Sequence, residues 1–375
     1  MNKIKTILIL LCTMTSCVSI IQNTIGNQLI DSKYEPNEQK NAFYTEVPYT
    51  IINGFIVIKA KINKSEKEYN FIFDTGACTL FSEDLINDFG LKNGITIVNR
   101  DANGSDVVGK SFISTLTIGS LNINNLRINT TSTDFFETKG CGEKIDGIIG
   151  FNILKQGYYY FNAPNRKLIV TNQIEKLPKE NLANPQRIKR KMAKIYIPVV
   201  GYKKEWLLID SGYADGDILI NKSSKLINPK RKPIKEFEYP LGSIVSEKLT
   251  TFSYYEDIIT ICNFKLLTSI QKINTEKFSN RIGSKFISNN NVILDVKNKR
   301  IFTTILKKKS TVDTIRNIRF IYKKGILRVA GVVFGSKISA QLIKTNDTII
   351  KINDTEMSIF KNECDFLKWF CYRIM

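Results

Sequence analysis

Two long blocks of the chain, at residues 46–173 and 195–306, show a partial alternation of apolar and polar positions with a period of two. Such alternation predicts β-strands with one buried face. β-Branched and aromatic residues fill the strongest runs of the first block, at 56–58, 69–73 and 116–128, and Asn-Gly or Gly-Ser pairs mark turns between such runs. We therefore expect an all-β protein.

One helix start stands out within the first block. Ser82 is a favourable N-cap residue, and the apolar positions Leu85, Ile86 and Phe89 follow it. Gly90 then supplies the glycine that commonly ends a helix. We expect a short helix between Ser82 and Gly90.

The two blocks repeat each other at three places. Three segments of the first block each have a counterpart in the second: Phe71–Gly76 matches Leu207–Gly212, Ile149–Phe151 matches Ile282–Ser284, and Phe161–Leu168 matches Leu294–Ile301. The matches keep their order and nearly their spacing, so two copies of one β unit are the economical explanation. The sequence predicts two pseudo-symmetric lobes.

The length of 375 residues predicts several domains, and the 43% of apolar residues suffices to fill their cores. Pro178, Pro185 and a basic run indicate a linker between the two blocks. We expect the following division: signal peptide 1–17, polar tether 18–45, first lobe 46–173, linker 174–194, second lobe 195–306, and a small β and α domain at 315–375.

The N-terminus has the pattern of an export signal. Lys3 and Lys5 precede the apolar run 7–11, which is too short to cross a bilayer. A cysteine directly after small residues looks like a bacterial lipoprotein processing site, which would make Cys17 the lipidated first residue of the mature protein. Simple cleavage nearby without a lipid is the alternative. We expect an exported protein, either anchored to a membrane on the periplasmic or cell-surface side or secreted.

The formal charge of +20 raises nucleic acid or an anionic polymer as a partner. Lysine, however, is spread through every segment without the interleaved aromatic residues of a base-stacking surface. A scaffold for an anionic polymer would need a contiguous positive groove, which this scattered pattern does not indicate. We therefore expect no nucleic-acid partner.

Histidine is absent from the chain, which excludes Ser-His and Cys-His nucleophile systems and the commonest metal ligand. The cysteines beyond the signal have no metal-ligand spacing: Cys78, Cys141, Cys262, Cys364 and Cys371. An exported chain can pair Cys78 with Cys141, but the sequence does not establish this disulfide. Catalysis would rest on carboxylates, Lys, Tyr or Cys, and we expect neither a cofactor nor a metal.

The repeated loops place one carboxylate each at the end of an apolar strand. Asp74 and Asp210 are these carboxylates, and the residues that follow them can shape and fix the loops: Thr75 and Ser211 through their hydroxyl groups, Gly76 and Gly212 through a tight turn. Pseudo-twofold symmetry would bring Asp74 and Asp210 close enough to share one proton. The ionised member would then activate a water, and the protonated member would donate to a peptide carbonyl.

At these residues the chain resembles the pepsin and retropepsin family of aspartic peptidases, through Phe73–Ala77 and Ile148–Gly150. The resemblance covers about residues 45–306. It implies an all-β pair of lobes around a cleft, hydrolysis of a peptide or protein substrate by Asp74 and Asp210, and an apolar-Gly element beneath each catalytic loop. These two elements would be Ile149-Gly150 and Ile282-Gly283.

The second half departs from the family pattern. Tyr213 stands where a small residue is usual, and Arg281 stands where the first apolar residue of the Ile282-Gly283 element is expected. An unpaired buried arginine is costly, so Arg281 should reach solvent or a carboxylate such as Asp215 or Asp217. Otherwise this lobe has lost catalytic geometry, and the chain is a peptide-binding protein without activity.

A hairpin that closes over the substrate in the family would fall near Val98–Phe112. Asn103-Gly104 is a good turn there, but no tyrosine marks the tip. We therefore expect the hairpin without assigning a catalytic residue to it.

The C-terminal segment looks like a PDZ domain, because Gly335–Leu342 leads into the turn-rich run Asn346–Asp354. Asn346 replaces the usual glycine of a Gly-Asp turn, which asparagine tolerates at positive φ. In that family a peptide adds a strand to the sheet, and the only candidate docking strand is 326–333. An amphipathic helix is expected from one apolar stripe, Phe360, Cys364, Leu367 and Cys371. Asp347 and Asp354 fall in turns, where a capping or solvated role is expected.

Overall fold

The computed structural model describes the chain at residues 36, 38–92, 94–100, 106–133, 136, 143–191, 194–202, 205–214, 216–242, 247–262, 264–276, 278–306, 318–323, 326–333, 343–361, 365–366 and 369. The expected signal peptide, Cys17 and most of the tether lie outside these residues. Within them, no helix combines the length and apolar character needed to cross a membrane.

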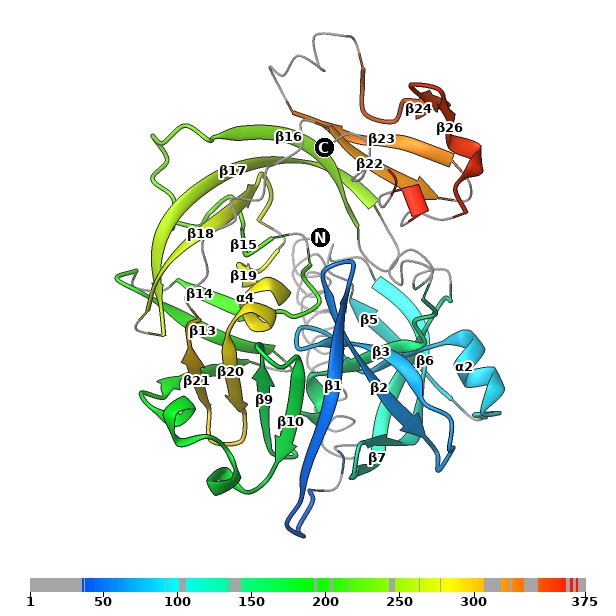
Figure 1. Ribbon diagram of the computed structural model, residues 1–375, viewed down its shortest axis with the longest axis vertical. Helices are drawn as coiled ribbons and strands as arrows, with labels where there is room; N and C mark the ends of the chain where they lie inside the picture. The colour runs from blue at the N-terminus through cyan, green and yellow to red at the C-terminus, as the bar shows by residue number, and fades with distance from the viewer. Residues whose placement is uncertain are drawn as a thin grey trace, which may run out of the picture.

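The protein is mostly β-strand, as the alternation predicted, and two large sheets dominate it (Figure 1). Over the described residues, the larger sheet has thirteen strands in this order: β11 (Gln186–Arg187), β21 (Arg300–Thr304), β20 (Asn291–Asp295), β9 (Tyr158–Asn162), β10 (Lys167–Thr171), β1 (Tyr44–Ile52), β2 (Phe55–Ile62), β3 (Tyr69–Asp74), β8 (Gly147–Gly150), β4 (Leu80–Ser82), β7 (Leu121–Thr131), β6 (Asp106–Ile118) and β5 (Ile95–Arg100).

The second sheet belongs to the second block of the sequence. It has eight strands in the part of the chain that is described, in this order: β12 (Lys189–Lys191), β13 (Lys194–Val200), β14 (Trp206–Ile209), β19 (Arg281–Ile282), β15 (Ile218–Ile220), β18 (Phe264–Ile273), β17 (Glu247–Ile261) and β16 (Lys235–Gly242).

The same strand order occurs in both blocks, which confirms the predicted repeat. The run β2-β3-β8-β4-β7-β6-β5 of the first block corresponds to β13-β14-β19-β15-β18-β17-β16 of the second. In each block the strand that precedes the aspartate runs parallel to the short strand of the Ile-Gly element, with Ile72 opposite Ile148 and Leu208 opposite Arg281. We call these units lobe 1 and lobe 2.

The helices of the described residues are short, and one of them lies where the sequence predicted a helix. Helix α2 (Glu83–Asp88) begins after Ser82, whose hydroxyl accepts the N–H of Leu85 at 3.3 Å, and Gly90 with φ of +55° ends it. Further helical elements in the described part of the chain are α4 (Ser284–Asn289) and the 3-10 turns η1 (Phe151–Ile153), η2 (Ile174–Lys176), η3 (Lys179–Leu182) and η4 (Met357–Ile359). The predicted cap and helix end at Ser82 and Gly90 are confirmed.

The two lobes share a sheet. Strand β20, from the end of the second block, pairs with β9 of the first, with Val292 opposite Phe161 and Leu294 opposite Tyr159. The expected linker also contributes, because β11 pairs with β21 and β12 pairs with β13. One hydrophobic cluster accordingly runs from Val47 to Ile301 across both lobes.

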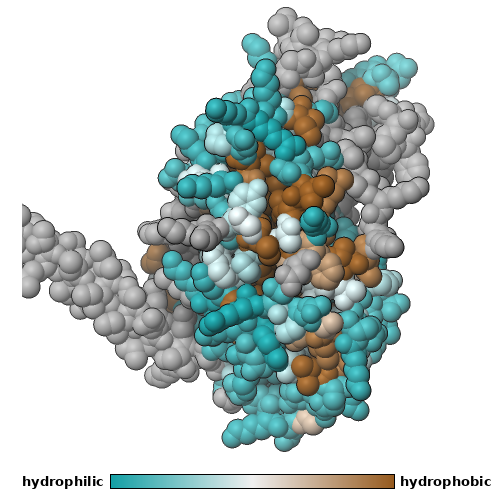
Figure 2. Space-filling model, turned by 90° about the vertical axis from the view of Figure 1, so that its left-hand side faces the viewer, coloured by the Kyte–Doolittle hydropathy of each residue, from teal (hydrophilic) through white to brown (hydrophobic). Residues whose placement is uncertain are grey.

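Lobe 2 exposes some apolar side chains on its outer face. Figure 2 shows apolar patches between polar ones on the face that lies at the left of Figure 1, where β17 and β18 are drawn. Ile258 and Leu267, which are cross-strand partners on these strands, are 62% and 55% exposed. Polar side chains therefore do not cover this face completely.

The C-terminal module forms a separate small sheet with strands β22 (Ile318–Lys323), β23 (Ile326–Val332) and β24 (Thr348–Ile349), followed by the hairpin β25 (Lys351–Ile352) and β26 (Thr355–Glu356). Asn346 adopts φ of +76°, which confirms its predicted positive φ. The Asp347 carboxylate accepts the N–H of Lys344 at 2.7 Å, as expected of a capping residue. Leu327, Met357, Phe360 and Phe366 form the module's core.

The expected docking strand of this module is flanked on both sides at several positions. Strand β23 pairs with β22 along one edge and with β24 along the other, where Arg328 lies opposite Thr348. Val333 then bridges to Phe237 of β16, so the module sits against the long hairpin of lobe 2 (Figure 1). Strand β23 has no open edge at these positions, so a peptide that adds a strand would need the edge of a different strand or a different part of β23. Residues 335–342, Cys364, Leu367 and Cys371 lie outside the described residues.

Candidate active site

The two aspartates stand at equivalent ends of buried strands. Asp74 is the last residue of β3, and Asp210 directly follows β14. Each strand is hydrogen-bonded on both sides and carries buried apolar residues up to the aspartate, Phe73 in lobe 1 and Ile209 in lobe 2. A strand held in this way fixes the position of the loop at its end.

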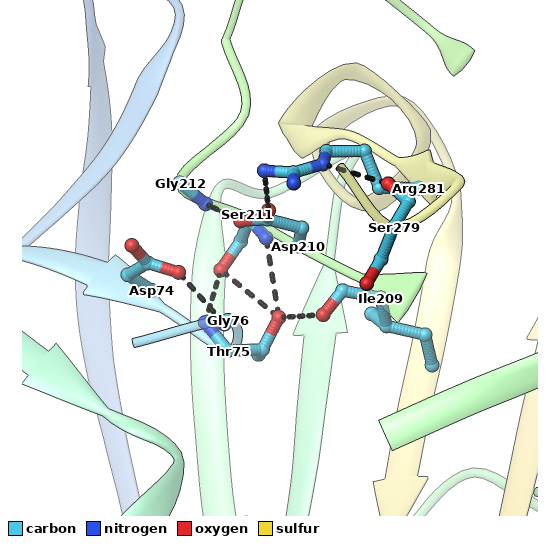
Figure 3. A network of polar contacts seen from close by, with 9 residues as sticks. All are labelled: Asp74, Thr75, Gly76, Ile209, Asp210, Ser211, Gly212, Ser279 and Arg281. Atoms are coloured by element: carbon cyan, nitrogen blue, oxygen red, sulfur yellow. Dashed lines mark hydrogen bonds and ion pairs between the residues drawn. The ribbon is translucent and has the colours of Figure 1, made fainter. Parts of the chain in front are cut away.

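Reciprocal hydrogen bonds join the two loops (Figure 3). The N–H of Thr75 donates to Ser211 Oγ at 2.9 Å, and the N–H of Ser211 donates to Thr75 Oγ1 at 3.1 Å. Each hydroxyl in turn donates at 2.7 Å to a carbonyl of the opposite lobe, Thr75 to Ile209 and Ser211 to Phe73. Thr75 and Ser211 are fully buried, so water does not compete with these bonds.

The glycines of the loops bring the carboxylates together. The N–H of Gly76 donates to Asp74 Oδ1 at 2.7 Å, and the N–H of Gly212 donates to Asp210 Oδ1 at 3.2 Å. A Cβ at Gly76 would lie 2.7 Å from Asp210 Oδ1, and a Cβ at Gly212 would lie 2.1 Å from Asp74 Oδ2. Each glycine therefore faces the carboxylate of the other lobe, and a side chain there would displace it.

The Ile-Gly elements lie beneath these loops. Ile149 and Ile282 are buried, and the glycine after each contacts loop backbone. A Cβ at Gly150 would lie 2.3 Å from the Ala77 carbonyl oxygen, and a Cβ at Gly283 would lie 2.4 Å from the carbonyl oxygen of its counterpart, Tyr213. The residue after each glycine donates its N–H to the same carbonyl, at 2.9 Å in both lobes. This close approach of backbone explains why glycine is required.

The protonation of Asp74 is shifted by its surroundings. The pKa of Asp74 is raised to about 7, mainly by burial and also by the charge of Asp210 and a hydrogen bond with its carboxyl group. The Gly76 N–H and the charge of Arg281 act in the opposite direction. Asp74 therefore holds its proton until the pH approaches neutrality.

Arg281 pairs with Asp210 itself. Its Nη1 donates to Asp210 Oδ2 at 2.8 Å, and the two side chains are only 13% and 8% exposed. The expectation that Arg281 reaches a carboxylate is confirmed, but the partner is Asp210 and not Asp217, whose carboxylate accepts the Ser269 hydroxyl at 2.8 Å. Asp215 lies outside the described residues. Strand β19 pairs directly with β14, and this register explains why Arg281 meets Asp210.

Lys194 is a neighbour of the site that sequence reasoning missed. Tyr196 of β13 lies opposite Leu208 of β14, and continuing this antiparallel register brings Lys194 beside Asp210. Burial lowers the pKa of Lys194 and the charge of Arg281 lowers it too, whereas Asp210 and Cys78 raise it. Only the strand register could have identified Lys194 as a neighbour of Asp210. The same register places Lys194 at the position that Phe55 occupies in lobe 1.

Tyr213 is accommodated by packing. Its ring is buried and belongs to a cluster with Leu219 and aromatic residues of the β16–β17 hairpin, Phe237, Phe252 and Tyr254. Lobe 2 thus fills the space beside its loop with an aromatic ring, where lobe 1 has the small Ala77. The hairpin expected near Val98–Phe112 is present as β5 and β6, and its turn, with Asn103-Gly104, lies outside the described residues.

Within the described ranges, no three His, Cys, Asp or Glu residues gather as they would around a metal ion. Cys141 is not among the described residues, so the proposed disulfide partner of Cys78 cannot be placed. Cys262 is buried in lobe 2, and burial raises the pKa of its thiol to about 11.

Comparison with known proteins gives one family match. A family profile described as "Aspartyl protease" matches residues 58–153, a span that contains the Asp74 loop and Gly150. No curated protein matches the chain. Among solved structures that match is the crystal structure of basic 7S globulin from soybean, with a TM-score of 0.43 and 8% identity over 70% of this chain and 95% of that chain. Lobe 1 is thus similar in sequence to the aspartyl proteases.

Proposed function

We propose that the protein is an aspartic endopeptidase, in which Asp74 and Asp210 activate a water for attack on a peptide bond. The observation that carries this proposal is the reciprocal bonding of Thr75 and Ser211, with each loop glycine against the carboxylate of the other lobe. Two carboxylates on one pseudo-twofold axis are what a shared-proton dyad needs. The family match of lobe 1 supports the same reaction class.

The proposed mechanism uses one ionised and one protonated carboxyl group. The ionised carboxylate accepts a proton from the water as its oxygen attacks the peptide carbonyl. The protonated carboxyl donates to the carbonyl oxygen, and the pair later protonates the leaving amine. A pKa of about 7 keeps one proton on Asp74 over the acidic and near-neutral range, as this mechanism requires.

The test is removal of each carboxylate with little change of shape. Asp74→Asn and Asp210→Asn should each lower kcat by about 10²–10⁴-fold, because one carboxyl group cannot both accept and donate the protons. Asp295→Asn is a matched control, since Asp295 is a buried aspartate that pairs with Arg300 outside the loops. Full activity of Asp210→Asn would contradict the two-lobe mechanism and favour a dimer built on Asp74.

A second candidate function, peptide binding without hydrolysis, is favoured by the ion pair between Arg281 and Asp210. A cation on the second aspartate competes for the oxygen that would hold the water. Calorimetric titration with an unstructured peptide, followed by mass spectrometry of that peptide, separates the candidates. Binding with the peptide recovered intact at every pH from acid to neutral would support this second function.

We propose that the protein is exported and that Cys17 carries a lipid, on the basis of the short apolar run and the small residues before it. Lipidation would hold the folded part at a membrane through the polar tether. Mass spectrometry of the mature N-terminus tests this location. An unmodified N-terminus beyond residue 17 would reject the lipid anchor and leave only the proposal of export.

For the C-terminal module we propose a PDZ-like role in recruiting peptide segments of the substrate. The support is its small sheet, the turn at Asn346 and its seat against the β16–β17 hairpin. A chain ending at Leu306 should still cleave a short peptide but lose efficiency on a larger protein. Thermal melting must show that the shortened chain is folded, because Val333 packs in the cluster of Tyr213. Complete loss on the short peptide in a folded chain would mean that the module completes the site.

A further inference from the structure

The structure gives the two aspartates unlike neighbours at one equivalent position. Ile148 lies opposite Ile72 in lobe 1, and Arg281 lies opposite Leu208 in lobe 2. Ile148 is buried in an apolar cluster, whereas Arg281 carries a guanidinium group to Asp210. Equivalent backbone positions therefore place an aliphatic side chain near one carboxyl group and a permanent cation on the other.

The two oxygens of Asp210 both accept hydrogen bonds from donors that favour negative charge. Oδ2 accepts Arg281 Nη1 at 2.8 Å, and Oδ1 accepts the N–H of Gly212 at 3.2 Å. Charge-assisted bonds of this kind are stronger than neutral ones and stabilise the ionised acceptor. Among the described residues, no Lys or Arg lies within ion-pair distance of Asp74, whose Oδ1 accepts the N–H of Gly76.

The other polar groups that face the pair reinforce this difference. Lys194 of β13 lies on the side of Asp210 and interacts with both Asp210 and Arg281. The loop after β3 carries the Cys78 thiol, which interacts with Lys194, and the loop after β14 carries the Tyr213 hydroxyl. The two cations Lys194 and Arg281 thus act on Asp210. Arg281 is also held by Ser279, whose carbonyl accepts its Nε–H at 3.3 Å.

We propose that Arg281 is a positioning residue that keeps Asp210 ionised, so that the single proton of the dyad resides on Asp74. This inference rests on the proposed function, since it assigns roles within the same site. Asp210 is then the base that accepts the proton of the water, and Asp74 is the acid that donates to the carbonyl oxygen. The pseudo-twofold symmetry of the two loops would leave these roles interchangeable. Arg281 removes the symmetry because, among the described residues, only Asp210 of the pair has a cation bound to its carboxylate.

The assignment has a measurable consequence at the alkaline limit of the site. Asp74 loses its proton as the pH passes about 7, so the singly protonated dyad should persist up to neutral pH. The charge of Arg281 lowers the pKa of Asp74. Replacement of Arg281 by a neutral residue should therefore move this ionisation to higher pH, by about one unit or more.

The experiment is carboxyl-carbon NMR of the full chain labelled at its aspartate carboxyl carbons, titrated across neutral pH. One resonance should titrate near pH 7 and be absent from Asp74→Asn. It should move to higher pH in Arg281→Ile, which copies Ile148, and in Arg281→Gln, which keeps a hydrogen-bond donor. Arg281→Lys keeps the charge and should restore much of the wild-type titration. Arg300→Ile breaks another short Arg-Asp pair, at 2.6 Å from Asp295, and should leave the resonance unmoved.

The proposal is overturned if the near-neutral resonance survives in Asp74→Asn, or if it stays at the same pH in folded Arg281→Gln. Should both neutral variants fail to fold, the Asp74→Asn and Arg281→Lys titrations still decide the location of the proton. The pH profile of kcat/KM separates this inference from the proposed function. If the expected titrations are seen but no cleavage occurs, the proposed function is rejected and the role of Arg281 stands. If cleavage occurs and its alkaline limit is the same in Arg281→Gln as in the wild type, the role of Arg281 is rejected.

Discussion

The two lobes have the same strand order but different chemistry beside their aspartates. In lobe 1 the positions around the loop are apolar: Phe55, Ala77 and Ile148 pack in one cluster. In lobe 2 the corresponding positions are Lys194, Tyr213 and Arg281. The backbone and the small buried residues that join the loops keep the twofold relation, while the larger side chains around them break it.

This difference shows how a repeated unit can separate two identical functional groups. Burial disfavours the ionised form of a carboxyl group, and it raises the pKa of Asp74. Adjacent cations favour the ionised form, and Arg281 supplies one to Asp210. An acid and a base can therefore arise from equivalent loops without any change in strand topology.

The largest expected effect comes from a methyl group at either loop glycine. Gly212→Ala would place its Cβ 2.1 Å from Asp74 Oδ2, and Gly76→Ala would place its Cβ 2.7 Å from Asp210 Oδ1. A displacement of about 1 Å can cost about a hundredfold in rate, so both should lose activity, with Gly212→Ala the more affected. Steady-state kinetics with a peptide measures this. Gly109→Ala is the control, because the nearest atom to its Cβ is at 3.5 Å, and equal rates for all three variants would refute the crowding argument.

The largest expected effect on stability comes from exchange of the flanking residue in lobe 1. Ile148→Arg would bury a cation among Val57, Ile72, Leu80 and other apolar residues. The carboxyl group equivalent to that of Asp210 is that of Asp74, which is protonated and would not neutralise this cation. We expect a loss of about 3–5 kcal/mol in the free energy of unfolding, measured by urea denaturation. Ile148→Val, with a loss of about 1 kcal/mol, controls for the change in packing. Equal losses for the two variants would show that lobe 1 tolerates a cation as lobe 2 does.

The reciprocal bonds between Thr75 and Ser211 should show coupling of intermediate size. Thr75→Ala and Ser211→Ala each leave a buried N–H and a buried carbonyl without their partner, at a cost of about 1–3 kcal/mol in unfolding free energy. The double variant should cost less than the sum by about 0.5–3 kcal/mol. Thr117→Ala removes an exposed hydroxyl and should have little effect. Strict additivity would mean that the two loops do not depend on each other.

The last expected effect is a change in how stability depends on pH. Asp74 has a higher pKa in the folded protein, about 7, than its ordinary value of 3.8, so the folded state binds this proton more tightly than the unfolded state. Its contribution to stability is therefore complete at low pH and is lost as the pH rises from about 4 to about 7. Asp74→Asn removes this loss and should therefore be more stable than the wild type above pH 7. Thermal melting at pH 5 and pH 8 tests the sign, and a parallel pH dependence for both proteins would contradict it.

The sequence predicted those features that local patterns determine. Alternation and turn residues located the strands, Ser82 and Gly90 located helix α2, and the repeated Asp-Thr-Gly and Asp-Ser-Gly loops located the site. The duplication also predicted the matching strand order, because the same local sequence folds in the same way twice.

Contacts that depend on strand register could not be predicted in this way. The partner of Arg281 follows from the pairing of β14 with β19, and the place of Lys194 follows from the pairing of β13 with β14. Each pairing joins segments that are distant in sequence, and a shift of one residue would turn these side chains to the other face. The neighbours of β23 could not be predicted for the same reason, since it pairs with β24 at Leu327 and Arg328 and with Phe237 at Val333.

The sheet shared by the lobes also bears on when the site can form. Strand β20, which begins at Asn291, pairs with β9, which ends at Asn162, so the sheet closes over a very long intervening segment. Pairings of high sequence separation are slow to form and come late in folding. A chain that has emerged only as far as lobe 1 therefore presents Asp74 without its partner loop. The shared sheet therefore closes only after the chain has been synthesised as far as β20, well beyond both aspartate loops.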